Sequence, residues 1–218
     1  MIRILRVLTI CLAAVVATPA GANLIVNSSF ETPVVPNGGF TNFPGGSTAI
    51  TGWTVVGVDS AVTNKNFTQS GITFQSQDGN QFIDLAGVTS NSNTSGVTQS
   101  IATVSGQPYS LSFYVGSSTD ATSNHFFFPS TIDLSINGGP RVSYTNPVGP
   151  TNMLNWQQFV VPFVATGATN LTFYNGSASN NFESMVDNVV VDAVPEPSSV
   201  ILIGLGTVGF LGRRRVGL

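Results

Sequence analysis

The side chains that could perform acid–base or nucleophilic chemistry are few in this chain. Its one histidine, His125, lies beside Phe126-Phe127-Phe128, and its one cysteine, Cys11, lies near the N-terminus. A catalytic triad needs a histidine close to a serine and an acid, but the chain has no Gly-x-Ser-x-Gly elbow. A zinc site needs several histidine or cysteine ligands, whereas this chain has one of each. Glycosidases need two opposed carboxylates, and the pattern selects no such pair. We therefore expect no catalytic residue and a protein that is not an enzyme.

Aromatic side chains with polar neighbours offer a different chemistry, the binding of sugars. An aromatic ring presents an apolar face to the C–H face of a pyranose, and nearby amides can bind its hydroxyl groups. The candidates are Tyr114, Tyr144, Trp156 and Tyr174. Tyr114 and Tyr174 are the stronger pair, because each is expected on the polar side of an alternating strand. For each candidate, packing within a sheet is the alternative role.

β-strands must position these residues, because apolar and polar residues alternate along much of the chain. Residues 109–115 alternate in this way, and Asn137-Gly138-Gly139-Pro140 is typical of a turn between two strands. Other strands are expected at 53–58, 82–85, 97–104, 132–136, 141–144, 159–163, 171–174 and 185–191. Between the two ends of the chain, no segment shows the apolar periodicity and the capping residues of an amphipathic helix. The pattern predicts a two-sheet β-sandwich.

Two long loops are expected on this scaffold. Residues 32–52 are rich in Pro, Gly and Asn, and residues 117–130 hold His125 and the three phenylalanines. Binding residues often lie in long loops on a β scaffold. We expect the Phe126–Phe128 run either to fold over the core or to form an exposed contact patch.

The region between the two ends is acidic. Five of the seven basic residues lie at the ends, which leaves Lys65 and Arg141 against nine carboxylates in residues 23–192, a net charge of about −7. Such a surface repels phosphate backbones, so no nucleic acid partner is expected. The same surface suits calcium and neutral sugars.

The N-terminus has the features of a secretory signal peptide over residues 1–22. Arg3 and Arg6 form a basic region, residues 8–16 form an apolar core, and Ala20-Gly21-Ala22 offers a cleavage site before Asn23. Cys11 would leave with this peptide. The exported domain, residues 23–192, would then contain no disulfide bond.

The C-terminus, residues 193–218, has the features of a sorting label. Pro195-Glu196-Pro197 precedes an apolar stretch, residues 200–211, and Arg213-Arg214-Arg215 follows it. As a helix this stretch spans about 18 Å, against about 30 Å of bilayer hydrocarbon. We predict a short transmembrane helix with its arginines in the cytoplasm, which places the domain outside. An ordinary membrane anchor is the alternative.

This tail resembles the PEP-CTERM sorting signal in its Pro-Glu-Pro element, apolar helix and terminal arginines. In that family the membrane protease exosortase processes the tail, in Gram-negative bacteria that make extracellular polysaccharide. The resemblance implies exosortase as a partner and contact with the membrane through the helix before processing. It also implies an exported protein at the cell surface or outer envelope, or secreted into the extracellular matrix.

The domain resembles galactose-binding-like jelly rolls, which include carbohydrate-binding modules and the choice-of-anchor families of PEP-CTERM proteins. Residues 23–31, Asn-Leu-Ile-Val-Asn-Ser-Ser-Phe-Glu, are similar to the opening of these domains, with Ser28 in place of the usual glycine. Later landmarks follow in order: Gly52-Trp53, Asp78-Gly79, residues 96–101, residues 106–113 and residues 185–189. The resemblance implies an all-β, jelly-roll β-sandwich over residues 23–192.

The same resemblance implies a structural calcium ion that ties the first strand to the last. The matching acidic residues are Glu31 and Asp187, with Asp78 as a weaker third ligand. Calcium prefers six to eight oxygen ligands, which carboxylates, backbone carbonyls and waters supply together. The alternative is that Glu31 and Asp187 are solvated or accept hydrogen bonds in turns.

Two functions remain open. The first is an exported, non-catalytic protein that binds extracellular polysaccharide through a calcium-stabilised jelly roll. The alternative is a structural or adhesive matrix protein that acts through protein contacts and has no sugar site. An exposed aromatic cluster among amides would favour the first, and a flat apolar patch around Phe126–Phe128 would favour the second.

Overall fold

The computed structural model describes residues 22–89, 91–119, 125–149, 152–177, 179 and 181–195. The predicted signal peptide, apart from Ala22, and the predicted transmembrane sorting helix lie outside these ranges. Within them, no helix is long and apolar enough to cross a membrane.

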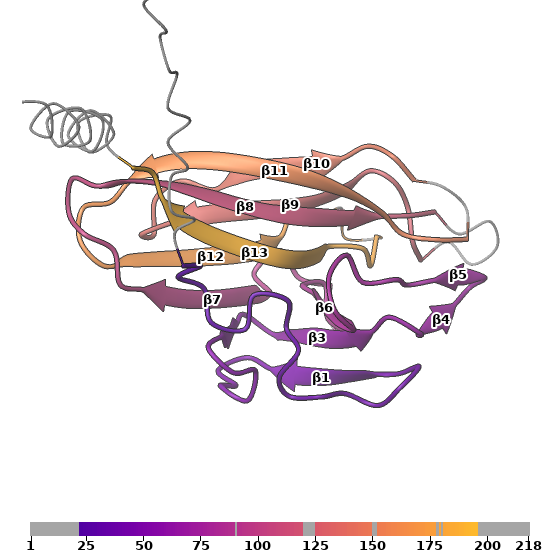
Figure 1. Cartoon of the computed structure of the whole chain (residues 1–218). Coiled ribbons are helices and arrows are strands. Elements are labelled where there is room, and N and C mark those ends of the chain that lie inside the picture. Colours follow the sequence, from indigo (N-terminus) through magenta and orange to yellow (C-terminus); the bar gives the residue numbers. More distant parts are fainter. Residues whose placement is uncertain are drawn as a thin grey trace, which may run out of the picture. The chain divides into compact units, whose positions relative to one another are not determined.

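The described residues form a jelly-roll β-sandwich of antiparallel strands (Figure 1), which confirms the predicted fold class. One sheet has the order β1 (Phe40–Pro44), β3 (Asp59–Asn64), β6 (Gln81–Asp84), β13 (Met185–Ala193), β8 (Pro108–Ser117) and β11 (Asn155–Val164). The second has the order β10 (Val142–Asn146), β9 (Ser130–Ile136), β12 (Thr169–Asn175), β7 (Gly96–Ile101) and β2 (Thr54–Val56). A separate hairpin joins β4 (Thr68–Gln69) to β5 (Ile72–Thr73).

Strict alternation places one face of each long strand in the core. Along β8, Leu111, Phe113 and Val115 are fully buried, while Ser112 and Tyr114 between them are half-buried. A strand exposes successive side chains on opposite faces, so the apolar set points between the sheets and the polar set points outward. This local rule explains why the sequence predicts β8 correctly.

The core between the sheets is aromatic at its centre. The ring of Phe173 contacts Trp53 and Phe113, with centroid distances of 6.2 Å and 5.1 Å. The indole nitrogen of Trp53 donates to the carbonyl of Asn27 at 3.2 Å. Such edge-on contacts between large rings contribute stability beyond the apolar area that they bury.

The first residues of the domain run along its last strand. The backbone nitrogen of Leu24 donates to the carbonyl of Val191 at 3.0 Å, and that of Val189 donates to the carbonyl of Ser28 at 2.9 Å. The two ends of the domain therefore lie side by side.

Among the described residues, four strands occur where the sequence pattern predicts none: β4 and β5 form the separate hairpin, and β1 and β3 belong to the six-stranded sheet. β1 lies inside the predicted loop 32–52 and pairs with β3 at the edge of its sheet. Every residue of β3 is buried, although its sequence, Asp-Ser-Ala-Val-Thr-Asn, does not alternate clearly. The reason is that Val62 is buried in the main core, while Ala61 and Thr63 on the opposite face of β3 are covered as well.

A second hydrophobic cluster covers part of the outer face of the six-stranded sheet. Its buried members are Ile72, Phe74, Phe82, Phe126, Leu154 and Met185. Phe126 is buried in this cluster, whereas Phe128 is 53% exposed. The Phe126–Phe128 run therefore folds over the second cluster rather than over the core between the sheets.

Candidate functional site

A pocket of about 470 Å³ opens beside this second cluster, over the six-stranded sheet. Part of its floor is one cross-strand row: Ala61 on β3 pairs with Asp84 on β6, which pairs with Met185 on β13. Residues directly opposite one another on antiparallel strands share a face. Their sequence neighbours Val62 and Ile83 are fully buried in the main core, so this row faces outward into the pocket.

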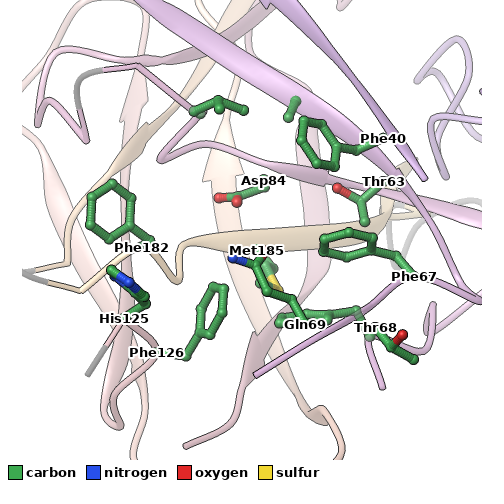
Figure 2. Close-up of a pocket in the computed structure, with 14 residues that line it drawn as sticks. Phe40, Thr63, Phe67, Thr68, Gln69, Asp84, His125, Phe126, Phe182 and Met185 are labelled. Carbon is green, nitrogen blue, oxygen red and sulfur yellow. The ribbon is translucent and has the colours of Figure 1, made fainter. Parts of the chain in front are cut away.

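Aromatic side chains from distant segments surround the pocket: Phe40, Phe67, Phe74, His125, Phe126 and Phe182. Figure 2 shows Phe40 and Phe67 on one side and His125, Phe126 and Phe182 on the other, with Asp84 and Met185 between them. The rings of Phe40, Phe67, Phe74 and Phe126 touch in sequence at centroid distances of 5.4, 5.4 and 5.0 Å. These four rings therefore form a continuous row of contacts in the pocket wall.

Asp84 is the acidic group at the floor. Its Oδ1 accepts a hydrogen bond from the backbone nitrogen of Ala86 at 2.9 Å, and the backbone of Ser184 supplies another. Burial, with a smaller contribution from the charge of Asp59, raises the pKa of Asp84 to about 7. No lysine or arginine is among the described residues that line the pocket. The charge of this carboxyl group therefore changes near neutral pH.

Asp59 lies next to this site, and its pKa is shifted in the opposite direction to that of Asp84. Burial alone would raise the pKa of Asp59, but hydrogen bonds from Val88, Thr89 and Asn42 lower it overall. Its Oδ2 accepts from the backbone nitrogens of Val88 and Thr89 at 3.0 and 2.9 Å, and from Asn42 Nδ2 at 2.9 Å. Gly87 permits this wrapping, because its φ is +65° and a Cβ there would lie 2.5 Å from Asp59 Oδ1.

Two of the predicted sugar-binding residues, Trp156 and Tyr114, share the outer face with the pocket but do not line it. Met185 of the pocket floor pairs with Gly116 on β8, and Gly116 in turn pairs with Trp156 on β11. Its ring packs 5.6 Å from Phe82, and its nitrogen donates to the carbonyl of Gln75 at 2.9 Å. Tyr114 is half-buried on β8. Sugar binding at these two residues stays a prediction.

The other two candidates, Tyr144 and Tyr174, lie elsewhere. Tyr144 packs edge-on against Phe113 and Phe159 at 5.3 and 5.4 Å, and burial raises its pKa. Tyr174 lies on the outer face of the five-stranded sheet, where the guanidinium carbon of Arg141 is 3.5 Å from its ring centroid. The four predicted residues therefore do not form one site.

The predicted calcium ligands hold one loop, residues 76–81, through backbone hydrogen bonds. Glu31 Oε1 accepts from the nitrogens of Asn80 and Gln81 at 2.6 and 2.8 Å. Asp187 Oδ2 accepts from the nitrogens of Gln77 and Asp78 at 2.8 and 2.9 Å. Burial raises the pKa of Asp187 to about 8 against these bonds. Residues far apart in sequence thus meet at the same loop.

Backbone N–H groups already occupy one oxygen of each of these two carboxylates. Two N–H groups point at Glu31 Oε1 and two at Asp187 Oδ2, and a cation at either oxygen would have to displace them. In the described part of the chain, no three His, Cys, Asp or Glu side chains are grouped as metal ligands. The two carboxylates fit the alternative role, in which they accept hydrogen bonds in a turn. A calcium ion at this place stays a prediction.

Sequence reasoning missed most of the pocket. Phe40, Phe67, Phe74 and Phe182 come from segments that the pattern leaves as loops, and Asp84 reads as the polar position of a strand. One signal was present: Phe67 and Phe74 lie in a stretch rich in Asn, Thr, Gln and Ser. Large apolar residues in such a polar segment indicate that it folds against a surface.

The family model described as "Protein of unknown function (DUF642)" matches residues 23–192, and that described as "PEP-CTERM protein-sorting motif" matches residues 193–215. A search of curated proteins found no match.

Two solved structures illustrate the similarities to known folds. The CBM22-1 xylan-binding domain of Xyn10C from Paenibacillus barcinonensis is 14% identical with a TM-score of 0.42, over 74% of this chain and 99% of that domain. An exo-β-1,3-galactanase from Phanerochaete chrysosporium is 15% identical with a TM-score of 0.38, over 72% of this chain and 29% of that one.

Proposed function

Since this chain belongs to the DUF642 family and ends in a PEP-CTERM sorting motif, we propose that it is a non-catalytic carbohydrate-binding protein of the cell surface. The sorting motif marks the chain as exported. In this proposal an exosortase processes the tail, and the domain meets the extracellular polysaccharide of a Gram-negative producer.

The aromatic pocket on the six-stranded sheet is the observation that carries this proposal. Its volume of about 470 Å³ lies within the range of about 300–1,000 Å³ that is typical of small-molecule sites. Phenyl faces can pack on the C–H face of a pyranose. Thr63, Gln69 and Asp84 add hydroxyl, amide and carboxyl groups that can bind sugar hydroxyls. The pocket thus combines apolar walls with a few polar groups.

The acids that line the pocket support binding without catalysis. Hydrolysis of a glycosidic bond normally uses two carboxyl groups on opposite sides of the bond. Among the described lining residues, Asp84 is the only carboxylic acid. Neighbouring Asp59 is engaged by Val88, Thr89 and Asn42. This arrangement supports recognition rather than cleavage.

The test is retention of the purified chain on the polysaccharide that its producer makes. We expect saturable retention that is lost in the double variant Phe40→Ala, Phe67→Ala. Tyr174→Ala is the matched control, because it removes an aromatic ring from the other sheet. Loss of retention in Tyr114→Ala or Tyr174→Ala alone would place the site at those residues instead. No retention of the unmodified chain would refute the proposal.

A structural role through protein contacts is the second candidate, and one edge strand favours it. β11 has a sheet neighbour on one side only, and Val160 and Val164 on it are 60% and 63% exposed. An exposed apolar edge strand can pair with another chain. A concentration-dependent increase in mass by light scattering, abolished by Val160→Lys, would support this role.

A further inference from the structure

The charges around the pocket are unbalanced. Asp84 at its floor is bonded by backbone N–H groups, and no lysine or arginine is among the described lining residues. The two basic residues of the domain are placed elsewhere. Lys65 is exposed and does not line the pocket, and Arg141 donates to the carbonyl of Asn93 at 2.6 Å while covering Tyr174. The described lining residues therefore supply Asp84 with no lysine or arginine.

A second carboxylate strengthens the negative potential. Asp59 is held ionised by its hydrogen bonds, and it is close enough for its charge to act on Asp84. A carboxylate in partly apolar surroundings loses solvation that only an opposite charge or strong hydrogen bonds restore. His125 is the remaining titratable group in the lining. A cationic ligand would relieve this imbalance, whereas a neutral ligand would leave it.

The pocket walls favour the same kind of ligand. A phenyl ring carries negative charge density on its face, which attracts an ammonium group within about 6 Å of the ring centroid. Phe40 and Phe67 on one side, and Phe126 and Phe182 on the other, flank the space in front of Asp84 (Figure 2). A carboxylate at the base of an aromatic enclosure is complementary to an ammonium group attached to a compact, partly apolar ring.

We propose that this pocket selects amino sugars whose amine is unacetylated and positively charged, with the ammonium group at Asp84 and the sugar ring against the phenylalanines. The inference rests on the proposed function and narrows its substrate class. Acetylation would remove the charge and add bulk at the floor. An uncharged hexose would keep the ring contacts but lose the ion pair.

Three trisaccharides with one backbone test this selection. Cellotriose, fully deacetylated chitotriose and N-acetylated chitotriose share β-1,4-linked glucose rings and differ only at C2, as hydroxyl, ammonium and acetamide. Titration calorimetry on the purified chain should show chitotriose binding tighter than the other two by about tenfold or more, which corresponds to about 1.4 kcal/mol, because its ammonium group can form a charge-assisted hydrogen bond to Asp84. The preference should weaken as salt is added.

Two variants separate charge from ring contacts. Asp84→Asn keeps the side-chain shape and should remove the preference for chitotriose. Asp133→Asn is the matched control, because it removes the same charge from the five-stranded sheet. Phe40→Leu, at a 41% exposed position on an edge strand, keeps apolar bulk and should weaken chitotriose binding severalfold without unfolding the domain.

The outcomes are distinct. Equal affinity for cellotriose and chitotriose would overturn the amino-sugar inference and leave the sugar-binding function intact. A preference that survives Asp84→Asn would also overturn it. No binding of any trisaccharide would refute the inference, while retention on the producer's polysaccharide would still decide the proposed function. Binding of choline with none of the sugars would overturn the inference, because the pocket would then accept a cation without a sugar ring.

Discussion

At the scale of single residues, Asp59 and Asp84 differ in how their hydrogen bonds balance burial. Asp59 accepts three backbone or side-chain N–H bonds that lower its pKa, whereas burial dominates at Asp84 and raises its pKa to about 7. Environment, and not residue type, therefore sets how readily each of the two aspartates ionises near neutral pH.

This difference predicts a pH dependence of stability. The folded pKa of Asp84 is raised above its ordinary value, so the unfolded chain ionises first as the pH rises. The contribution of Asp84 to the free energy of unfolding is fully present below about pH 4, decreases between about pH 4 and 7, and stays low above pH 7. The loss should be on the order of a few kcal/mol.

Denaturant unfolding at pH 4.5 and 7.5 measures this effect. Asp187 contributes in the same direction, because burial raises its pKa to about 8. The comparison is therefore with Asp84→Asn, which should lose less stability across the interval than the unmodified chain. Parallel losses in both proteins would contradict the raised pKa of Asp84.

Glu31 supports a second prediction at the residue scale. Glu31→Ala should lower the free energy of unfolding by about 1–3 kcal/mol even in chelator, because the backbone N–H of buried Gln81 loses its acceptor, together with that of Asn80. Thermal melts in chelator and in calcium measure it, with Asp133→Ala as a control away from this loop.

The same melts decide the calcium prediction. A rise in melting temperature with calcium that disappears in Glu31→Ala and Asp187→Ala would establish an ion at these carboxylates. If the unmodified chain has the same melting temperature in calcium and in chelator, the calcium prediction is wrong, and the role of the two carboxylates is to accept backbone hydrogen bonds.

At the scale of elements, the hairpin β4–β5 depends on aromatic contacts rather than on sheet pairing. It has two residues in each strand, and such a hairpin is not stable alone in water. Phe74, which directly follows it and is 1% exposed, contacts Phe67 and Phe126 at centroid distances of 5.4 and 5.0 Å. These rings fasten the hairpin beside the pocket.

Phe74→Ala should therefore open this part of the molecule. Removal of a buried phenylalanine costs about 3–5 kcal/mol, and we expect the cost to appear as local unfolding of residues 64–80. Hydrogen exchange by mass spectrometry should show faster exchange there and unchanged protection of β8 and β12. Phe128→Ala, at an exposed position, is the control. Uniform loss of protection across the sandwich would contradict a locally fastened hairpin.

At the scale of the whole molecule, the sandwich and the sorting motif are separate in sequence. The last bonds of the domain join Val194 to its neighbours: its nitrogen donates to the carbonyl of Pro108 at 2.9 Å, and its carbonyl accepts from Gln107 Nε2 at 2.8 Å. The sorting motif occupies residues 193–215. Most of the motif thus follows the last of these contacts.

Truncation after Pro195 tests this separation. Because the truncated chain keeps both bonds of Val194, its melting temperature should equal that of the full chain. Its location should change, since the apolar stretch and the arginines are gone. Cell fractionation should find the full chain with the envelope or matrix and the truncated chain released. A lower melting temperature after truncation would show that the tail supports the fold.

The sequence alone determined the class of fold and the export of this protein. Alternation such as Leu111, Phe113 and Val115 is a local property, and it predicts a strand wherever one face is buried. The PEP-CTERM motif is equally local, because its elements stand in order at one end of the chain. The prediction of the β-sandwich and that of the sorting motif were both confirmed.

Only the tertiary structure decided where a ligand could bind. Phe40, Phe67, Asp84, Phe126 and Phe182 are spread over more than half of the domain, and no local pattern joins them. They meet because the pairing of β3, β6 and β13 aligns the floor, and because the hairpin and the residue 125–128 segment fold over the same face. Register and long-range packing are collective properties of the folded chain, so the pocket appears only when all its parts are in place.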